Sequence, residues 1–215
     1  MTPNIPLSLR LRKKAEKDVA YAQDLIVGEL YNFFPNAIIH GGTAIWRCYN
    51  GNRFSEDVDV YIERDLNKIE EFFRSLENIG FKIIKKRVKD NSIYSDLDLN
   101  GIPARFEATF QNKSPFLRRY ETCESFFINV NTLSPEDLVI EKVETFLKRL
   151  KIRDLYDINF LLNYVEDITA VSEHLKKLIA NYKKPLDEKN LVAIIIIGAV
   201  PTSEQIITEI RRWVK

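Results

Sequence analysis

Two aspartates one residue apart, preceded by a pair of glycines, are the residues of this 215-residue sequence best suited to chemistry. Gly41 and Gly42 follow a short apolar stretch, and Asp57 and Asp59 alternate with valines in the segment DVDVYI. Because side chains alternate across a strand, both carboxylates are expected on one face, about 7 Å apart at the backbone. Their charges repel unless a cation lies between them, and carboxylate oxygens are ligands that suit Mg²⁺ or Mn²⁺.

A third carboxylate would complete a two-metal site for phosphoryl or nucleotidyl transfer, and Glu107 in the segment ARFEATF is the candidate. The glycine pair would let backbone amides approach a triphosphate, with the dipole of the following helix behind them. Thr43 could add a hydroxyl to the same site. Arg53 and Ser55, just before the aspartates, could hold phosphate oxygens.

The elements that must position these residues follow from the periodicity of the apolar side chains. Helical spacing or helix boundaries predict helices at 9–34, 43–49, 66–80 and from 134 onward. Alternation or short apolar runs predict strands at 37–40, 57–63, 81–89, 92–99 and 104–110. We therefore predict an α+β fold, with a mixed sheet and flanking helices over residues 1–131 and a helical domain over residues 132–215.

Composition limits the class of protein. The formal net charge of +1 gives no whole-protein attraction for nucleic acid, so such binding would depend on the local basic clusters at 9–17, 82–89 and 147–153. These clusters would suit an RNA such as tRNA if they flank the carboxylates, and are otherwise solvated faces. The two cysteines, Cys48 and Cys123, form neither a disulfide framework nor a metal-ligand spacing, and packing is their expected role.

Location is predicted from what the sequence does not contain. The first charged side chain comes at Arg10, and the residues before it lack the apolar stretch of a signal peptide. The most apolar run, at 191–200, is about half a membrane span and is predicted to be a buried helix or strand. We expect a cytoplasmic protein without a membrane partner, which the two unpaired cysteines also suit.

The spacing of these motifs resembles a known family. The stretch GGTAIWRCYNGNRFSEDVDVYI looks like the active-site signature of the DNA polymerase β-type nucleotidyltransferase superfamily. RFSEDVDV together with EKVETFLKRLKIRDLYDINFLL is similar to the AbiEii/AbiGii toxin-type nucleotidyltransferases, and the resemblance covers residues 38–162. It implies a polymerase β-like fold with Asp57, Asp59 and Glu107 as ligands of Mg²⁺ or Mn²⁺. It further implies that Lys142 contacts the nucleotide phosphates.

The same resemblance places Asp157, together with Asp154, near the reacting centre, where a carboxylate could accept the proton of the acceptor. We do not expect Lys142 or Asp157 to lie in the core. On spacing alone, Lys142 also fits a solvated, salt-bridged helix face, and Asp157 an exposed position.

Simpler interpretations of the other residues stay open as well. Asp57 and Asp59 could form a solvated strand face, as is expected of Asp96 and Asp98, and a lone strand carboxylate such as Glu107 is often solvated or ion-paired. The glycines could form a plain turn. Two ion pairs are also conceivable, Arg53 with Glu56 or Asp57, and Asp154 with Arg153 or Lys151.

The predicted activity is metal-dependent transfer of a nucleoside monophosphate from an NTP to RNA, such as tRNA, or to protein, with release of pyrophosphate. The resemblance also implies the toxin of a toxin–antitoxin or phage-defence system and a cognate antitoxin protein as partner. The alternatives are a nucleotide-binding or interaction module without turnover, and an enzyme that modifies a small molecule such as an antibiotic.

Overall fold

The computed structural model describes residues 5–214, which form two units. The first unit runs up to Asn50 and from Phe54 to Thr132, and the second consists of 51–53 and the chain from Leu133 onward. The segment 51–53 therefore belongs to the second unit although it lies within the sequence of the first. Periodicity did not indicate this, because three residues are too few to carry a pattern.

The first unit is built on a mixed sheet with the strand order β3-β4-β5-β2-β1-β7-β6 among the residues described. Its strands are β1 (Ile38–His40), β2 (Asp57–Ile62), β3 (Phe81–Val88), β4 (Ser92–Leu99), β5 (Ile102–Phe110), β6 (Phe116–Glu121) and β7 (Phe127–Thr132). The pairs β2–β5 and β1–β7 are parallel and the other pairs are antiparallel. The strand DVDVYI thus lies at the centre of the sheet.

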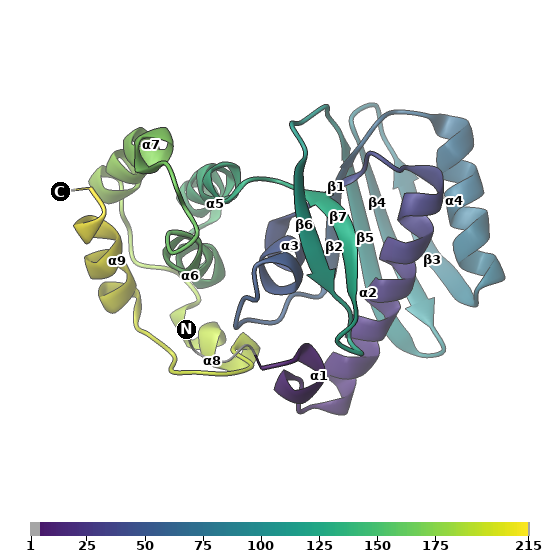
Figure 1. Cartoon of the computed structure of the whole chain (residues 1–215), viewed down its shortest axis with the longest axis horizontal. Coiled ribbons are helices and arrows are strands. Elements are labelled where there is room, and N and C mark those ends of the chain that lie inside the picture. The colour runs from purple at the N-terminus through teal and green to yellow at the C-terminus, as the bar shows by residue number, and fades with distance from the viewer. Residues whose placement is uncertain (1–4, 215) are drawn as a thin grey trace. The chain divides into compact units, whose positions relative to one another are not determined.

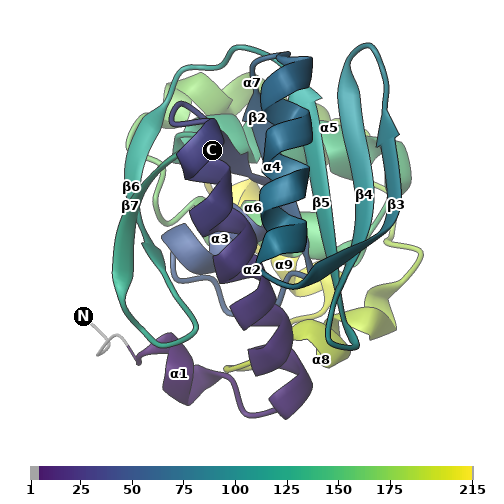
Figure 2. The ribbon, with the colours of Figure 1, turned by 90° about the vertical axis from the view of Figure 1, so that its right-hand side faces the viewer.

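The helices of the first unit are α1 (Leu7–Arg10), α2 (Lys14–Phe33), α3 (Gly41–Cys48) and α4 (Leu66–Asn78). Figures 1 and 2 show α2 and α4 side by side on one face of the sheet. The rings of Phe72 and Phe73 on α4 contact Phe106 on β5, and Val58 on β2 is also fully buried. Residues that alternate with Phe106 and Val58 therefore point to the opposite face, away from these helices.

The second unit is helical, with α5 (Pro135–Arg149), α6 (Ile152–Leu161), α7 (Ile168–Ala180), a 3₁₀ turn η1 (Glu188–Asn190), α8 (Leu191–Ile194) and α9 (Ser203–Arg212). The Ser134 hydroxyl accepts a hydrogen bond from the backbone amide of Asp137 and so caps the start of α5. The helix ends just before Leu150, which adopts a left-handed backbone conformation with φ of 52°. Leu138, Val139 and Val143 form a fully buried stripe along this helix. The mixed sheet followed by helices confirms the predicted fold class.

The strands β6 and β7 were not predicted, and the predicted burial of the apolar run 191–200 was wrong. The charges in FLRRYE obscure the alternation of β6, and β6 and β7 expose several large apolar side chains, so neither strand has the pattern of a half-buried one. In the apolar run 191–200 only Leu191 is buried, and Val192 is 67% exposed.

Burial raises the pKa of Cys48 to about 12, which fits its predicted packing role. Across residues 5–214, none of the helices combines the length and apolar character that a membrane span needs.

Candidate functional site

The structure brings the three predicted carboxylates together on the sheet face that points away from α4. Asp59 on β2 pairs directly with Glu107 on the parallel strand β5, and Asp57 pairs with Arg105. All three acids alternate with buried residues of the core, and each is partly exposed. A face that carries three acids on two adjacent strands concentrates negative charge at the centre of the sheet.

The proximity of these acids affects the protonation of Glu107. Partial burial raises the pKa of the Glu107 carboxyl, and the negative charges of Asp59 and then Asp57 raise it further. The Arg105 guanidinium lowers it, but does not outweigh the other causes. The neighbouring carboxylates therefore make Glu107 harder to ionise than an isolated glutamate, and a nearby positive charge would relieve this effect.

Gly41 is needed because the Asp59 carboxylate lies directly against its backbone. Gly41 adopts φ of +68°, and a Cβ at this position would overlap Oδ2 of Asp59 and lie 3.1 Å from its Cγ. Helix α3 starts at this residue, two positions earlier than predicted, and Gly42 in its first turn is buried. The glycine pair thus places the start of a helix next to a carboxylate of the site.

Thr43 and Ser55 hold the beginning of β2 in place. The buried Thr43 hydroxyl donates a hydrogen bond to the Asp57 carbonyl, while Ser55 accepts one from Gln23 at 2.8 Å through its carbonyl. Gln23 Nε2 also lies 3.5 Å from the Thr43 hydroxyl. The Thr43 hydroxyl is therefore directed at the backbone of Asp57, and Gln23 is a supporting residue that the helical pattern of α2 did not distinguish from core.

Arg105 is the cation of this carboxylate face, and the sequence analysis missed it. Its guanidinium nitrogens lie 3.2 Å from Oδ1 of Asp57, 3.4 Å from Oδ1 of Asp96 and 4.0 Å from Oε1 of Glu107. The Tyr94 hydroxyl donates to the same Asp96 oxygen at 2.8 Å. Asp96, expected to be an idle solvated residue, is therefore part of the charge network. The available signal was the alternation that puts residues 105 and 107 on one face.

We expect Arg105→Ala to make the protein more dependent on divalent cations. Loss of exposed ion pairs contributes about 0–1 kcal/mol, so the melting temperature in EDTA should fall by at most about 4 °C. Added Mg²⁺ should raise the melting temperature of Arg105→Ala more than that of the wild type, because the unscreened carboxylates attract it more strongly. The control is Arg87→Ala on β3, which removes an exposed arginine of the same sheet that forms no ion pair with these carboxylates. An equal response to Mg²⁺ in both variants would contradict this role.

The second unit contains a separate, buried ion cluster that includes Arg53. The Arg53 guanidinium donates two parallel hydrogen bonds to Asp157, from Nε to Oδ1 at 2.5 Å and from Nη2 to Oδ2 at 2.6 Å. Lys142 Nζ lies 2.7 Å from the second of these oxygens and 3.7 Å from Oδ1 of Asp154. Arg149, which is exposed, completes the cluster from outside with two 2.7 Å bonds to Asp154.

These contacts bear on the two ion pairs that the sequence left open. Arg53 forms an ion pair with Asp157, and Asp154 forms one with Arg149.

The expectation that Lys142 and Asp157 lie outside the core was wrong, since they are 7% and 0% exposed. Burial raises the pKa of Asp157, but the charges and hydrogen bonds of Arg53 and Lys142 outweigh it and hold the pKa below its ordinary value. Asp157 is therefore a buried, ionised residue.

The carboxylate face has some, but not all, of the features of a divalent-cation site. Within residues 5–214, no three His, Cys, Asp or Glu side chains are grouped closely enough to hold a metal ion as they stand. Two of the acids, Asp57 and Glu107, have Arg105 within ion-pair distance. The donor set itself, three carboxylates on neighbouring strands, is chemically suited to Mg²⁺ or Mn²⁺, and the pKa of Glu107 is raised by partial burial and then by the charges of the other two.

Comparison with known proteins decides the family. The sequence pattern described as "Nucleotidyl transferase AbiEii toxin, Type IV TA system" matches residues 25–206. The chain belongs to the AbiEii nucleotidyltransferase toxin family. Among curated proteins, none matches it.

Solved structures share the AbiEii fold at low sequence identity. JHP933 from Helicobacter pylori has a TM-score of 0.66 and 16% identity over 95% of this chain and 92% of its own. MenT4, a nucleotidyltransferase toxin from Mycobacterium tuberculosis, has a TM-score of 0.64 and 17% identity over 93% of this chain and 82% of its own. The AbiEii match includes both the carboxylate strands and the helices that carry the ion cluster.

Proposed function

We propose that this AbiEii-family chain transfers a nucleoside monophosphate from an NTP to a macromolecular acceptor, RNA such as tRNA or protein, and releases pyrophosphate. The observation that carries the proposal is the carboxylate face, where Asp57, Asp59 and Glu107 lie on paired strands beside the start of α3. A divalent cation there, Mg²⁺ or Mn²⁺, would neutralise charge on the phosphate oxygens as it develops.

The chain's own groups would bind and orient the reactants. Asp57, Asp59 and Glu107 would hold the cation, and the first amides of α3 would bind phosphate oxygens, which a helix amino terminus favours. Gly41 and Gly42 permit a close approach because they have no side chain.

For two residues of the buried cluster, the role proposed here differs from the role that the resemblance implies. Lys142 and Asp157 would act by fixing Arg53, four residues before Asp57 in the chain, instead of touching nucleotide and acceptor directly. Asp154 would assist them through its contact with Lys142.

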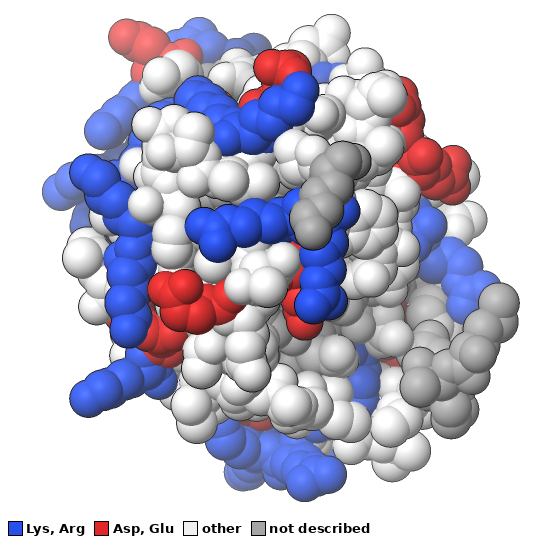
Figure 3. Space-filling view, turned by 90° about the vertical axis from the view of Figure 1, so that its left-hand side faces the viewer, with Lys and Arg blue, Asp and Glu red and all other residues white. Residues whose placement is uncertain are grey.

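A polyanionic acceptor is supported by the surface charge. Lysine and arginine side chains make up most of the charged surface on the face shown in Figure 3, with smaller groups of acidic side chains between them. Some lysines of the second unit are already paired, as Lys177 is with Glu144 at 2.7 Å. Such a surface suits salt-sensitive binding of a phosphate backbone. The toxin family supports a cognate antitoxin as a further partner.

A thermal-shift measurement tests the binding step of this proposal. Mg²⁺ with NTP should raise the melting temperature by ~5 °C or more at saturation, because 100-fold excess over Kd contributes about 2.7 kcal/mol. The double variant Asp57→Asn, Asp59→Asn should fold and lose this rise. Asp98→Asn is the matched control, since Asp98 accepts a bond from the Gly101 amide on the same sheet. A full rise in the double variant would remove the metal assignment.

A further inference from the structure

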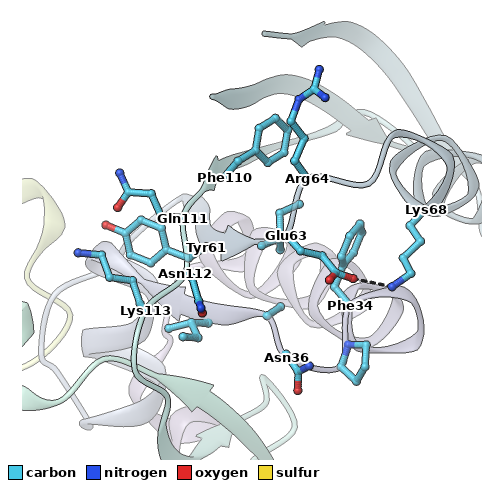
Figure 4. A pocket seen from close by; sticks show the side chains of 14 residues that line it. Phe34, Asn36, Tyr61, Glu63, Arg64, Lys68, Phe110, Gln111, Asn112 and Lys113 are labelled. Atoms are coloured by element: carbon cyan, nitrogen blue, oxygen red, sulfur yellow. Dashed lines mark hydrogen bonds and ion pairs between the residues drawn. The ribbon is translucent and has the colours of Figure 1, made fainter. Parts of the chain in front are cut away.

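The first unit contains a second hollow that the proposed reaction does not use. A cavity of about 570 Å³ lies at the rim of the sheet, where three loops meet. Its lining comes mainly from 34–38, which leads into β1, from 61–64 at the end of β2, and from 110–113 at the end of β5 (Figure 4). The volume lies in the range of sites that hold a small molecule.

The charge of this rim pocket is positive. Among its cations, Lys68 is neutralised by Glu63 at 2.5 Å. Arg64 and Lys113 are exposed, and no carboxylate of the described chain lies within ion-pair distance of either. Each cation instead lies over an aromatic ring, Arg64 6.0 Å from the centre of Phe110 and Lys113 5.4 Å from that of Tyr61. Two cations without acidic partners favour an anionic ligand.

The rest of the lining suits a flat ring with polar edges. The Tyr61 ring is held in place by stacking on His40, at 3.9 Å between centroids and 10° between planes. Asn36, Gln111 and Asn112 add side-chain amides, which can both donate and accept hydrogen bonds. The flexible Arg64 and Lys113 side chains can move from the rings to a phosphate, which would leave the Phe110 ring, and the face of Tyr61 that His40 does not cover, to a base.

The rim pocket adjoins the carboxylate face along a strand. Tyr61 follows Asp59 by two residues on β2, so its side chain lies on the same face about 7 Å further along the backbone. His40 on β1, whose ring stacks on Tyr61, is the direct strand partner of Asp59 on β2. A ligand in the rim pocket would therefore lie next to the carboxylates without occupying their place.

We propose that the rim pocket binds one nucleotide unit, with its phosphate on Arg64 and Lys113 and its base against the aromatic and amide lining. The nucleotide could be a free mononucleotide or one unit of a single-stranded RNA. The second source rests on the proposed RNA acceptor, whereas binding itself does not require that transfer occurs.

Binding in EDTA tests this proposal without catalysis. The probe is a fluorescein-labelled single-stranded RNA of six nucleotides, with AMP and UMP as unlabelled competitors. The double variant Arg64→Ala, Lys113→Ala should bind the RNA at least ~10-fold more weakly. The slope of log affinity against log salt concentration should become shallower by about 0.7, the value for one phosphate contact on a single strand. The charge-matched control is Arg87→Ala, Lys89→Ala, which removes two exposed cations outside the rim pocket.

The competitors distinguish the two sources. Displacement of the RNA by AMP or UMP from the wild type would indicate a free nucleotide, and RNA binding that millimolar AMP and UMP leave unchanged would indicate a single strand. The variant Asp57→Asn, Asp59→Asn should bind the RNA normally, so failure of transfer and failure of the rim pocket can be told apart. Wild-type affinity and salt slope in Arg64→Ala, Lys113→Ala, or no binding of any probe to the wild type, would overturn the proposal.

Discussion

Asp157→Ala is expected to lower the melting temperature by about 6–20 °C. The substitution leaves Arg53 and Lys142 buried without the carboxylate that both contact. Removal of one partner from a buried ion pair costs about 3–5 kcal/mol, and each kcal/mol corresponds to about 2–4 °C in a chain of this size. Lys142→Ala should also be destabilising, whereas Lys148→Ala, an exposed lysine on the same helix, should change the melting temperature little.

The pH dependence of this effect follows from the lowered pKa of Asp157. A carboxylate with a depressed pKa contributes stability above its ordinary value of 3.8 and loses it as the pH falls through the lower folded-state value. The difference in melting temperature between wild type and Asp157→Ala should therefore be full near neutral pH and shrink below about pH 3.8. A difference of less than 2 °C at pH 7 would contradict the role of the cluster in holding Arg53.

Loss of the same residues should impair the proposed reaction. At a temperature where each variant is folded, Lys142→Ala and Asp157→Ala should lower transfer by at least ~10²-fold, the usual effect of lost positioning or electrostatic support. Lys148→Ala should transfer normally. Normal transfer by Lys142→Ala would confine the functional residues to the carboxylate face.

Gly41→Ala is expected to reduce transfer by at least ~10²-fold. The added Cβ would displace the Asp59 carboxylate, and a shift of about 1 Å in a reacting group is enough for such a loss. The positive φ should also destabilise the fold by about 1–2 kcal/mol, because residues with a side chain disfavour this conformation. The measurement compares transfer rates of folded protein alongside melting temperatures.

The control for Gly41→Ala is Gly101→Ala, which separates the two causes. Gly101 also has a positive φ, of +87°, but no atom lies within 4 Å of the position its Cβ would take. Gly101→Ala should therefore lose stability from the backbone conformation alone and keep its transfer rate. If Gly41→Ala transfers as fast as Gly101→Ala, the Asp59 carboxylate has no role at its present position.

The carboxylate face could be predicted from sequence because its pattern is local. Strict alternation in DVDVYI fixes Asp57 and Asp59 on one face wherever the strand lies. Glu107 was found by the same alternation, although its pairing with Asp59 depends on a parallel register between distant strands. The mixed fold likewise followed from clear periodicity up to residue 110.

The ion cluster could not be predicted, since its contacts are non-local. Arg53 and Asp157 are 104 residues apart, and no periodicity shows which carboxylate a given arginine will meet. The burial of Lys142 depends on two acids from the next helix, whereas its own helix shows only mixed charge. Arg105 lies on the same strand face as Glu107, but its partners Asp57 and Asp96 come from two other strands, which the alternation within one strand does not show.

Transfer of label from an NTP is the most direct test of the central claim. Wild type and Asp57→Asn, Asp59→Asn are incubated with Mg²⁺, total RNA and cell protein, and each of the four NTPs labelled at the α-phosphate. We predict that the wild type transfers label from at least one NTP to RNA or protein with release of pyrophosphate. The double variant, folded by its melting curve, should transfer at least ~10²-fold less. Equal transfer by the two proteins, or no transfer of any label by folded wild type, would contradict the account.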